Sequence, residues 1–308
     1  MKIKPFDIIL PFFLVFCTTT SCEKPVIDDN ENGTENLKPE SGKVTLTLSS
    51  MSISQSEFGD SESVPATSSR TTHAIKDLCT RISFAVFDSE GNKVKNINQN
   101  KSDKSFGSIS TTIDKGVYDI VVIAHNGEGN ATISSPMKIT FKDNKVTDTF
   151  YYYDTMTIDE NTSSDIILKR AVAMFRLMIK DNTPDNIRSM KFYYTGGSST
   201  FDATTGYGCV NSKQTELRNV PTSAYTGESS YDIYTFPHEG DKKLKIEVSA
   251  LESASSTKAS YSRPFTDVTM KRNYITRCPV NFFGEDPGSG RGFDLTTNDE
   301  WGYIDYEY

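Results

Sequence analysis

Apolar residues alternate with polar ones in short runs along most of this chain, and this period of two limits the possible folds more than any other feature. Val44, Leu46 and Leu48 lie on one face of such a run and threonines on the other, as in a half-buried β-strand. Comparable runs occur at residues 81–87, 107–113, 117–125, 137–141, 146–152, 189–194, 231–236, 243–251 and 274–282. No stretch of comparable length has a helical period with capping residues. The pattern predicts an all-β protein.

The 308 residues correspond to about two domains at roughly 150 residues per domain. A polar, acidic run at 155–165 predicts a boundary between a first β-sandwich at 43–158 and a second at 159–285. Two pairs of segments are alike in position and favour two similar antiparallel sandwiches in tandem: 82–87 with 187–193, and 118–122 with 231–235.

Two other stretches are not single, regular strands in this pattern. The apolar run 165–179 is either two strands or one strand that bends between two sheets. Half of the residues from 49 to 72 are serine or threonine, which predicts a long exposed loop.

The first residues have the layout of a secretory signal, with Lys2 and Lys4 before an apolar run at 8–16 that is too short to span a bilayer. Residues 1–21 resemble a bacterial lipoprotein signal peptide, which would leave Cys22 as the acylated first residue of the mature protein. The alternative is an ordinary signal peptide, with Cys22 as a free thiol or a disulfide partner. Residues 22–42 are acidic and lack aromatics, which predicts a flexible tether.

The charge and the cysteine content argue against several classes of binding partner and of stabilising site. The net charge of −8 argues against a nucleic-acid partner and against a membrane surface held by charge alone. Once Cys17 and Cys22 are set aside, three cysteines remain: Cys79, Cys209 and Cys278. An odd number without a C-x-x-C spacing argues against a disulfide scaffold or a zinc site, so we expect mostly buried free thiols.

Residues that would carry catalysis are not grouped in the sequence. The three histidines, His73, His125 and His238, are isolated, and neither a phosphate-binding loop nor a nucleophile elbow occurs. We therefore expect no enzymatic activity, no metal and no cofactor. Aromatic residues make up 11% of the chain and could stack on sugars, so the alternative function is a surface glycan-binding lipoprotein that supports polysaccharide uptake. Tyrosines in sandwich strands more often serve packing.

Four short motifs occur in a characteristic order after the lipoprotein cysteine. They are Gly-Val-Tyr-Asp-Ile-Val-Val-Ile-Ala at 116–124, Leu-Lys-Arg-Ala-Val-Ala at 168–173, Arg-Asn-Tyr-Ile-Thr at 272–276 and Asp-Glu-Trp at 299–301. In this order they resemble the FimB-type fimbrillin-associated anchor lipoproteins of type V pili in the Bacteroidota.

The resemblance implies two transthyretin-like sandwich domains and assembly by β-strand exchange with other fimbrial subunits. It also implies attachment to the outer membrane through the lipid on Cys22, with acyl chains such as palmitate. The acidic patch after Cys22 resembles a surface-export signal, so display on the cell surface is expected rather than a periplasmic location. The expected function is that of a non-enzymatic fimbrial anchor or assembly subunit in cell adhesion, in contact with other fimbrial subunits and with a host surface ligand.

Two segments are candidates for the exchanged strand. The first is residues 43–49, because the following loop contains Arg70 and stalk subunits of this superfamily are cut by an arginine-specific protease. Against this, anchors are thought to keep the strand, and Arg70 could simply be a solvated charge. The second is the tail 286–308, in which a glycine-rich linker precedes Phe293, Leu295 and Trp301. The alternative for the tail is the last edge strand of its own domain.

Overall fold

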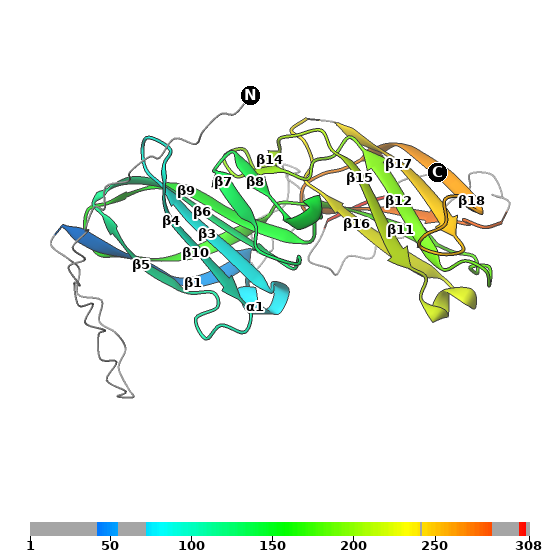
Figure 1. The fold of residues 1–308 in the computed structure, drawn as a ribbon, viewed down its shortest axis with the longest axis horizontal. Helices are drawn as coiled ribbons and strands as arrows, with labels where there is room; N and C mark the ends of the chain where they lie inside the picture. Colours follow the sequence, from blue (N-terminus) through cyan, green and yellow to red (C-terminus); the bar gives the residue numbers. More distant parts are fainter. Residues whose placement is uncertain (1–41, 55–71, 241, 285–301, 306–308) are drawn as a thin grey trace, which may run out of the picture. The chain divides into compact units, whose positions relative to one another are not determined.

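The computed structural model describes residues 42–54, 72–240, 242–284 and 302–305, which belong to one compact unit, Pro39–Tyr308. Strands dominate these residues, as Figure 1 shows. The helical turns are α1 (Ile75–Leu78), η1 (Lys142–Asn144) and η2 (Thr222–Tyr225). In the described ranges, no helix has both the length and the apolar character needed to cross a membrane. The prediction of a β-rich fold is confirmed.

An eight-stranded sheet contains most strands of the first half of the chain, in the order β2-β1-β10-β9-β6-β3-β4, with β5 also paired to β1. Its members are β1 (Lys43–Ser54), β2 (Thr72–Ala74), β3 (Arg81–Phe87), β4 (Lys93–Asn100), β5 (Ile109–Asp114), β6 (Gly116–His125), β9 (Thr149–Ile158) and β10 (Thr162–Arg170). Strands β9 and β10 share only two residue pairs, Lys169 with Tyr151 and Arg170 with Phe150. The sheet therefore folds over at this point into two layers.

Apolar side chains from both layers fill the space between them. Members of this first core include Leu46, Leu48, Phe84, Ile120, Phe150 and Leu168, all at most 1% exposed. They come from β1 and β10 on one side and from β3, β6 and β9 on the other. Burial of these alternating residues stabilises the folded sheet.

The second half of the chain forms two four-stranded sheets, in the orders β16-β11-β19-β20 and β15-β12-β17-β18. Their members are β11 (Ala173–Ile179), β12 (Ser189–Thr195), β15 (Lys213–Asn219), β16 (Ser229–Thr235), β17 (Lys243–Leu251), β18 (Tyr261–Thr269), β19 (Tyr274–Val280) and β20 (Gly302–Asp305). A second core lies between these sheets and includes Phe175, Phe192 and Phe265, each fully buried.

The two halves repeat one order of strand pairing. The layer β5-β1-β10 corresponds to β16-β11-β19. In each layer the strand that comes first in the chain pairs in parallel with the strand that comes last, β1 with β10 and β11 with β19. The layer β4-β3-β6-β9 corresponds to β15-β12-β17-β18. The segments at 82–87 and 187–193, predicted to be equivalent, fall in the equivalent strands β3 and β12.

The second predicted equivalence, between 118–122 and 231–235, is wrong. Residues 118–122 lie in β6, whose counterpart is β17, whereas residues 231–235 lie in β16, the counterpart of β5. Both segments read Tyr-Asp-Ile, but β6 lies within its sheet with a partner on each side, whereas β16 pairs only with β11.

Strand β1 is longer than the sequence predicts because it contains a β-bulge. Val44, Leu46 and Leu48 point into the core, the pairing with β10 shifts at residues 48–50, and Met51 and Ile53 then point into the same core. The bulge changes the phase of the alternation by one residue. Residues 49–54 of the expected loop at 49–72 are therefore part of a strand, and residues 55–71 lie outside the described ranges.

The polar run 155–165 contains the end of β9, the start of β10 and the connection between them, which passes from one layer of the folded sheet to the other. Strand β9 continues to Ile158 and β10 begins at Thr162, with Ile166 and Leu168 in the first core. The apolar run 165–179 is two strands, β10 and β11, separated by Ala171 and Val172, which are both fully buried. The chain passes from the first core to the second through these two residues.

Candidate functional site

The first strand of the described residues, β1, is an interior strand of its sheet. Residues 43–48 pair in antiparallel fashion with β5, and residues 46–53 pair in parallel with β10. Five apolar side chains point from β1 into the first core: Val44, Leu46, Leu48, Met51 and Ile53, each at most 5% exposed. At about 1.5–3 kcal/mol for each buried side chain, their burial contributes of the order of 10 kcal/mol as an upper estimate.

Hydroxyl groups tie the outer face of β1 to its neighbours. Thr47 Oγ1 and Ser110 Oγ of β5 lie 3.0 Å apart, and Ser49 Oγ lies 2.5 Å from Ser163 Oγ of β10. The backbone N–H of Thr45 donates to Asn161 Oδ1 at 2.9 Å. These contacts are exposed and each adds little, but together they fix the register of β1 on both sides.

The connection from β1 to β2 leaves and re-enters the sheet at two residues that are paired with each other. Ser54 of β1 and Thr72 of β2 are directly paired. Arg70, the candidate protease site, is in this connection and lies outside the described residues. Cys22, the candidate lipidation site, also lies outside them.

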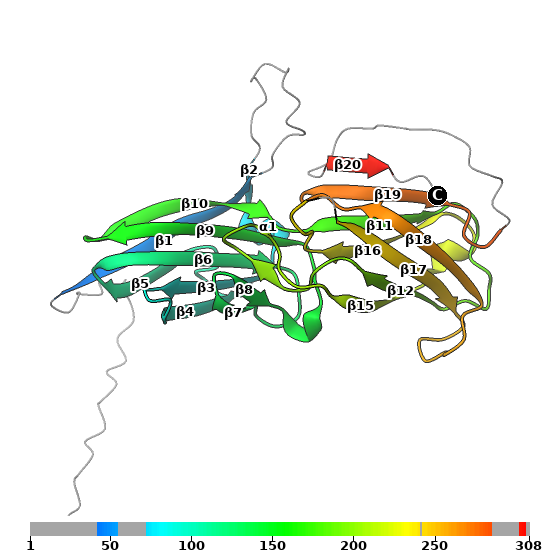
Figure 2. The ribbon, with the colours of Figure 1, turned by 90° about the horizontal axis from the view of Figure 1, so that it is seen from above.

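The C-terminal strand β20 pairs in parallel with β19, as Figure 2 shows beside the second half of the chain. Four residue pairs join them, from Tyr274 with Gly302 to Arg277 with Asp305. The candidate donor residues Phe293, Leu295 and Trp301 lie outside the described residues. Part of the tail therefore pairs with its own chain, at the edge of a sheet.

A small sheet links the two halves of the chain. It has the order β14-β13-β8-β7, with β7 (Thr132–Ser135) and β8 (Lys138–Thr140) from the first half and β13 (Phe201–Asp202) and β14 (Tyr207–Gly208) from the second. Phe201 pairs with Ile139, and the N–H of Ala203 donates to the Pro136 carbonyl at 2.9 Å. Each half thus contributes a hairpin to a common sheet.

A third apolar cluster lies at this junction and draws residues from both halves. Its members include Phe87, Val121, Ile123, Phe141, Tyr151, Val172, Met174, Phe201, Phe236 and Ile275, all buried. The ring centroid of Phe236 lies 5.3 Å from that of Phe141 and 5.0 Å from that of Phe201. Because the rings interlock across the junction, the halves share part of their core.

A buried arginine forms the polar part of the junction. Arg170, at the end of β10, donates from Nε to Asp148 Oδ1 at 2.8 Å and from Nη2 to Oδ2 at 3.0 Å. Its third nitrogen, Nη1, donates to Asn273 Oδ1 at 3.0 Å in the turn between β18 and β19. The guanidinium also lies 4.7 Å from the centroid of the Phe150 ring. Of these four contacts of one side chain, the one to Asn273 joins the two halves, and the other three hold the guanidinium in place within the first half.

The same turn supplies a second arginine. Arg272 donates from Nη1 to Tyr151 Oη at 3.1 Å and to the Gly206 carbonyl at 2.8 Å, and it lies over the Tyr207 ring. Gly206 has a φ of +76°, and a Cβ there would collide with Arg272 and Tyr151. A residue with a Cβ at this position would be strained and would displace the Arg272 and Tyr151 side chains.

Two of the motifs that carry the family resemblance meet at this junction. Arg170 belongs to the motif at 168–173 and Asn273 to the motif at 272–276, and the structure brings the two motifs together. The N–H of Asn273 also donates to the Val172 carbonyl at 2.9 Å. Sequence reasoning missed Asp148 and Tyr151, since neither side chain stands out in its strand pattern.

Groups suited to metal or thiol chemistry are dispersed. Cys79, Cys209 and Cys278 are free thiols, and Cys79 and Cys278 are buried, in line with the expectation. Within the described ranges, no group of three or more histidine, cysteine or carboxylate residues could hold a metal ion.

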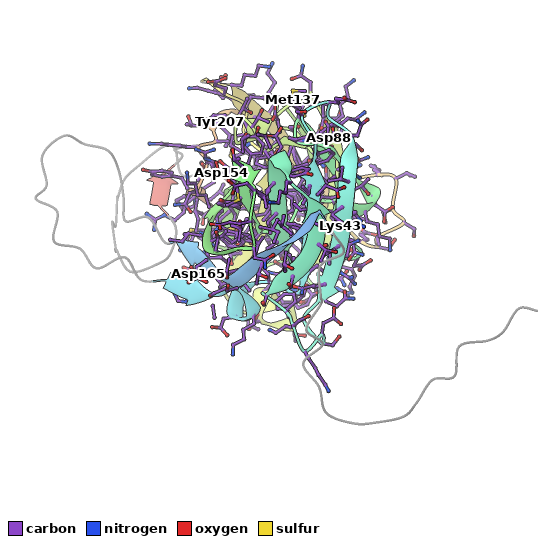
Figure 3. All side chains as sticks on the ribbon, turned by 90° about the vertical axis from the view of Figure 1, so that its left-hand side faces the viewer. Lys43, Asp88, Met137, Asp154, Asp165 and Tyr207 are labelled. Carbon is purple, nitrogen blue, oxygen red and sulfur yellow. The ribbon has the colours of Figure 1, made fainter. Side chains whose placement is uncertain are left out.

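Exposed charged side chains such as Lys43, Asp154 and Asp165 are on the outside of the first half (Figure 3).

The fold and the site define a β-rich protein in which, among the described strands, β1 lies inside its sheet, β20 lies at the edge of another, and the two halves share a core at their junction. More particularly, the chain belongs to the fimbrillin-A associated anchor proteins Mfa1 and Mfa2, because the sequence model of this family matches residues 31–307. The predicted resemblance to fimbrillin-associated anchors is confirmed. The family is one of fimbrial anchor proteins, so this protein is associated with fimbriae.

Three solved structures that match the chain have low sequence identity to it and TM-scores below 0.5. A candidate adhesin from Bacteroides ovatus has 11% identity, covers 86% of this chain and 92% of its own, and has a TM-score of 0.48. A fimbrial assembly protein from Parabacteroides distasonis has 12% identity, 77% and 90% coverage and a TM-score of 0.38. The fimbrial anchor protein Mfa2 from Porphyromonas gingivalis has 10% identity, 67% and 78% coverage and a TM-score of 0.39. No curated protein matches the chain.

Proposed function

We propose that this protein is a non-enzymatic, lipid-anchored subunit that attaches a type V fimbrium to the outer membrane and takes part in adhesion. The observation that carries the proposal is the match of the anchor family over residues 31–307. Its partners are other fimbrial subunits and the membrane, with a host surface ligand reached through the fimbrium.

In this proposal Cys22 carries the acyl chains that hold the protein in the outer membrane, facing the outside of the cell. Residues 22–42 space the folded part from the bilayer. A single acyl chain binds a membrane only marginally, so a diacylated cysteine suits a stable anchor better.

We further propose that the folded chain is two transthyretin-like sandwich domains in tandem. The repeated order of strand pairing supports this, with one core in each half. The limits that follow from the cores are 43–170 and 173–282 in place of 43–158 and 159–285, because β10 contributes to the first core. The tail 286–308 then carries the edge strand β20.

For strand exchange, the proposal assigns β1 as a retained strand and β20 as the exchanged one. Six residue pairs hold β1 to β5 and seven hold it to β10, with five side chains in the core. Four residue pairs hold β20, all on one side. At about 1 kcal/mol per hydrogen bond, β20 costs far less to release than β1. A sheet edge freed of its strand offers unpaired backbone groups to the strand of a neighbouring subunit.

Immunogold electron microscopy of cells that express the wild type, Cys22→Ala or Arg70→Ala tests the anchor role. We expect label at the bases of filaments, filaments shed from the Cys22→Ala cells, and no change for Arg70→Ala. Label spread over bare membrane, with filaments unchanged in Cys22→Ala cells, would exclude the anchor role. Loss of filaments in Arg70→Ala cells would show instead that cleavage, and therefore release of β1, is needed for assembly.

A further inference from the structure

The outer face of the sheet β15-β12-β17-β18 carries a group of lysines around one tyrosine. Along β12, Lys191, Tyr193 and Thr195 point away from the core, since Met190, Phe192 and Tyr194 between them are buried. Thr195 lies between Lys213 of β15 and Lys245 of β17. We call this surface the lysine face and define it by Lys191, Tyr193, Lys213, Leu217, Lys243 and Lys245.

The lysine face is open to solvent. Tyr193 is 38% exposed and Leu217 is 44% exposed, both high values for large apolar or aromatic side chains in a sheet. The equivalent face of the first half is covered at the junction, where Phe87 and Val121 are fully or almost fully buried. The repeat therefore leaves one of two equivalent sheet faces uncovered.

Carboxylates offset only part of the positive charge of the lysine face. In the described part of the chain, no ion pair involves the four lysines. Glu247, next to Tyr193 on the neighbouring strand, accepts a hydrogen bond from Ser262 Oγ at 3.2 Å. Asp267 lies in the bulge of β18 opposite Lys245 and places a second carboxylate at the margin of the face. Four lysines against these two carboxylates leave the face positive, although the whole chain has a net charge of −8.

We propose that the lysine face binds an anionic polysaccharide. Strands β12 and β17 are paired on both sides, so they offer no free backbone groups to an added peptide strand. Recognition must come from side chains, which here are ammonium groups and an amphipathic aromatic ring. Tyr193 suits stacking on the apolar face of a sugar ring, and the lysines suit its carboxylate or sulfate groups.

The spacing of the charges supports an extended, repeating ligand. Lys213 and Lys245 are on strands that flank β12, so their backbones are about 10 Å apart. Lys191 and Tyr193 are two positions apart on one strand, or about 7 Å. Ammonium groups about 10 Å apart, with an aromatic ring about 7 Å along the strand from one lysine, fit an extended polyuronate chain better than a small ion.

Affinity electrophoresis of the full chain in gels that contain polygalacturonate or neutral dextran tests the proposal. We expect polygalacturonate to retard the wild type and dextran to leave it unchanged. The triple variant K191Q/K213Q/K245Q should lose at least tenfold in affinity, and Tyr193→Ser should lose about threefold to tenfold with an unchanged melting temperature. The matched control K93Q/K95Q, which removes two lysines of β4 in the first half, should bind as the wild type does.

Three outcomes would overturn the proposal. The first is no retardation of the wild type by polygalacturonate. The second is equal binding of duplex DNA with no effect of Tyr193→Ser, which would show nonspecific attraction of any polyanion. The third is binding of a synthetic peptide of residues 285–308 at the lysine face without binding of the polysaccharide, which would identify a protein segment as the partner. None of these results bears on filament anchoring, so the proposed function is tested separately.

Discussion

The guanidinium of Arg170 reaches across the junction to the side chain of Asn273, with 3.0 Å between Nη1 and Oδ1, while its other two nitrogens hold Asp148. The Arg170 side chain is 5% exposed and that of Asp148 is 18% exposed. A charge pair at this depth is costly to break, because the remaining charge is left buried without a partner.

Arg170→Met is therefore expected to lower the free energy of unfolding by about 3–5 kcal/mol, because it leaves the Asp148 carboxylate without its partner. The measurement is urea denaturation followed by circular dichroism. Arg176→Met is the matched control, since Arg176 forms a similar two-bond pair with Asp232 while both side chains are about one-third exposed. The control should cost only about 1 kcal/mol or less. Equal losses for the two variants would show that the junction pair has no special role.

The shared apolar cluster predicts that both halves unfold together. Phe236→Ala removes the ring that contacts Phe141 and Phe201, and it should lower the free energy of unfolding by about 3–5 kcal/mol. Differential scanning calorimetry of the wild type should give one transition whose calorimetric and van't Hoff enthalpies agree. Two resolved transitions, with only one moved by Phe236→Ala, would contradict a common core.

The interior position of β1 predicts unequal effects of neighbouring substitutions. Leu48→Ala removes a fully buried side chain and should cost about 2–5 kcal/mol. Thr47→Ala alters the outer face, where the hydroxyl contact to Ser110 is exposed, and should cost about 1 kcal/mol or less. Urea denaturation of both variants provides the comparison. Similar small losses would mean that β1 contributes little to the core and is easily displaced.

The strand pattern could be predicted from the sequence wherever one face of a strand is buried and the other is not. β5 and the first part of β17 follow this rule. β3 and β6 are buried on both faces, and their apolar, β-branched composition indicates a strand instead. Edge strands such as β4, with the sequence Lys-Val-Lys-Asn-Ile-Asn-Gln-Asn, escaped detection because they bury little apolar surface. The second half of β1 escaped detection because the bulge after Leu48 shifts the alternation.

The strands of the candidate site could be predicted from the sequence, but the contacts at the junction could not. The early strand 43–49 and the C-terminal tail were identified from local pattern, which is visible in a single segment. The junction depends on contacts between residues about one hundred positions apart, such as Arg170 with Asn273. Sequence spacing says nothing about which strand ends meet until the sheet order is known.

Thiol reactivity should separate the three cysteines. Cys209 is exposed, whereas Cys79 and Cys278 are buried, and burial raises the pKa of the Cys79 thiol far above its usual range. One thiol per molecule should react with a disulfide reagent in the folded protein and three in urea, for a chain that carries Cys22→Ser and lacks the signal peptide. Cys209→Ser should abolish the reaction in the folded state. Rapid reaction of a second thiol would show that one of the cores opens readily.

The buried histidine at the end of β6 predicts a loss of stability in mild acid. His125 is 2% exposed, its Nδ1 accepts a hydrogen bond from the Gly127 N–H at 2.9 Å, and burial lowers its pKa from 6.5 to about 4. The unfolded chain therefore binds a proton on His125 at a higher pH than the folded chain does. The stability from the neutral ring is fully present above pH 6.5 and is lost as the pH falls toward 4, by about 3 kcal/mol.

Urea denaturation at several pH values between 7 and 4 measures this loss. His125→Phe should be less stable than the wild type at pH 7, because the Gly127 N–H loses its acceptor, but its stability should fall less between pH 6.5 and 4. His73→Gln, at a partly exposed position of β2, is the control and should keep the full pH dependence. If the wild type and His125→Phe lose stability equally over this range, the acid sensitivity arises from other groups and His125 is not its source.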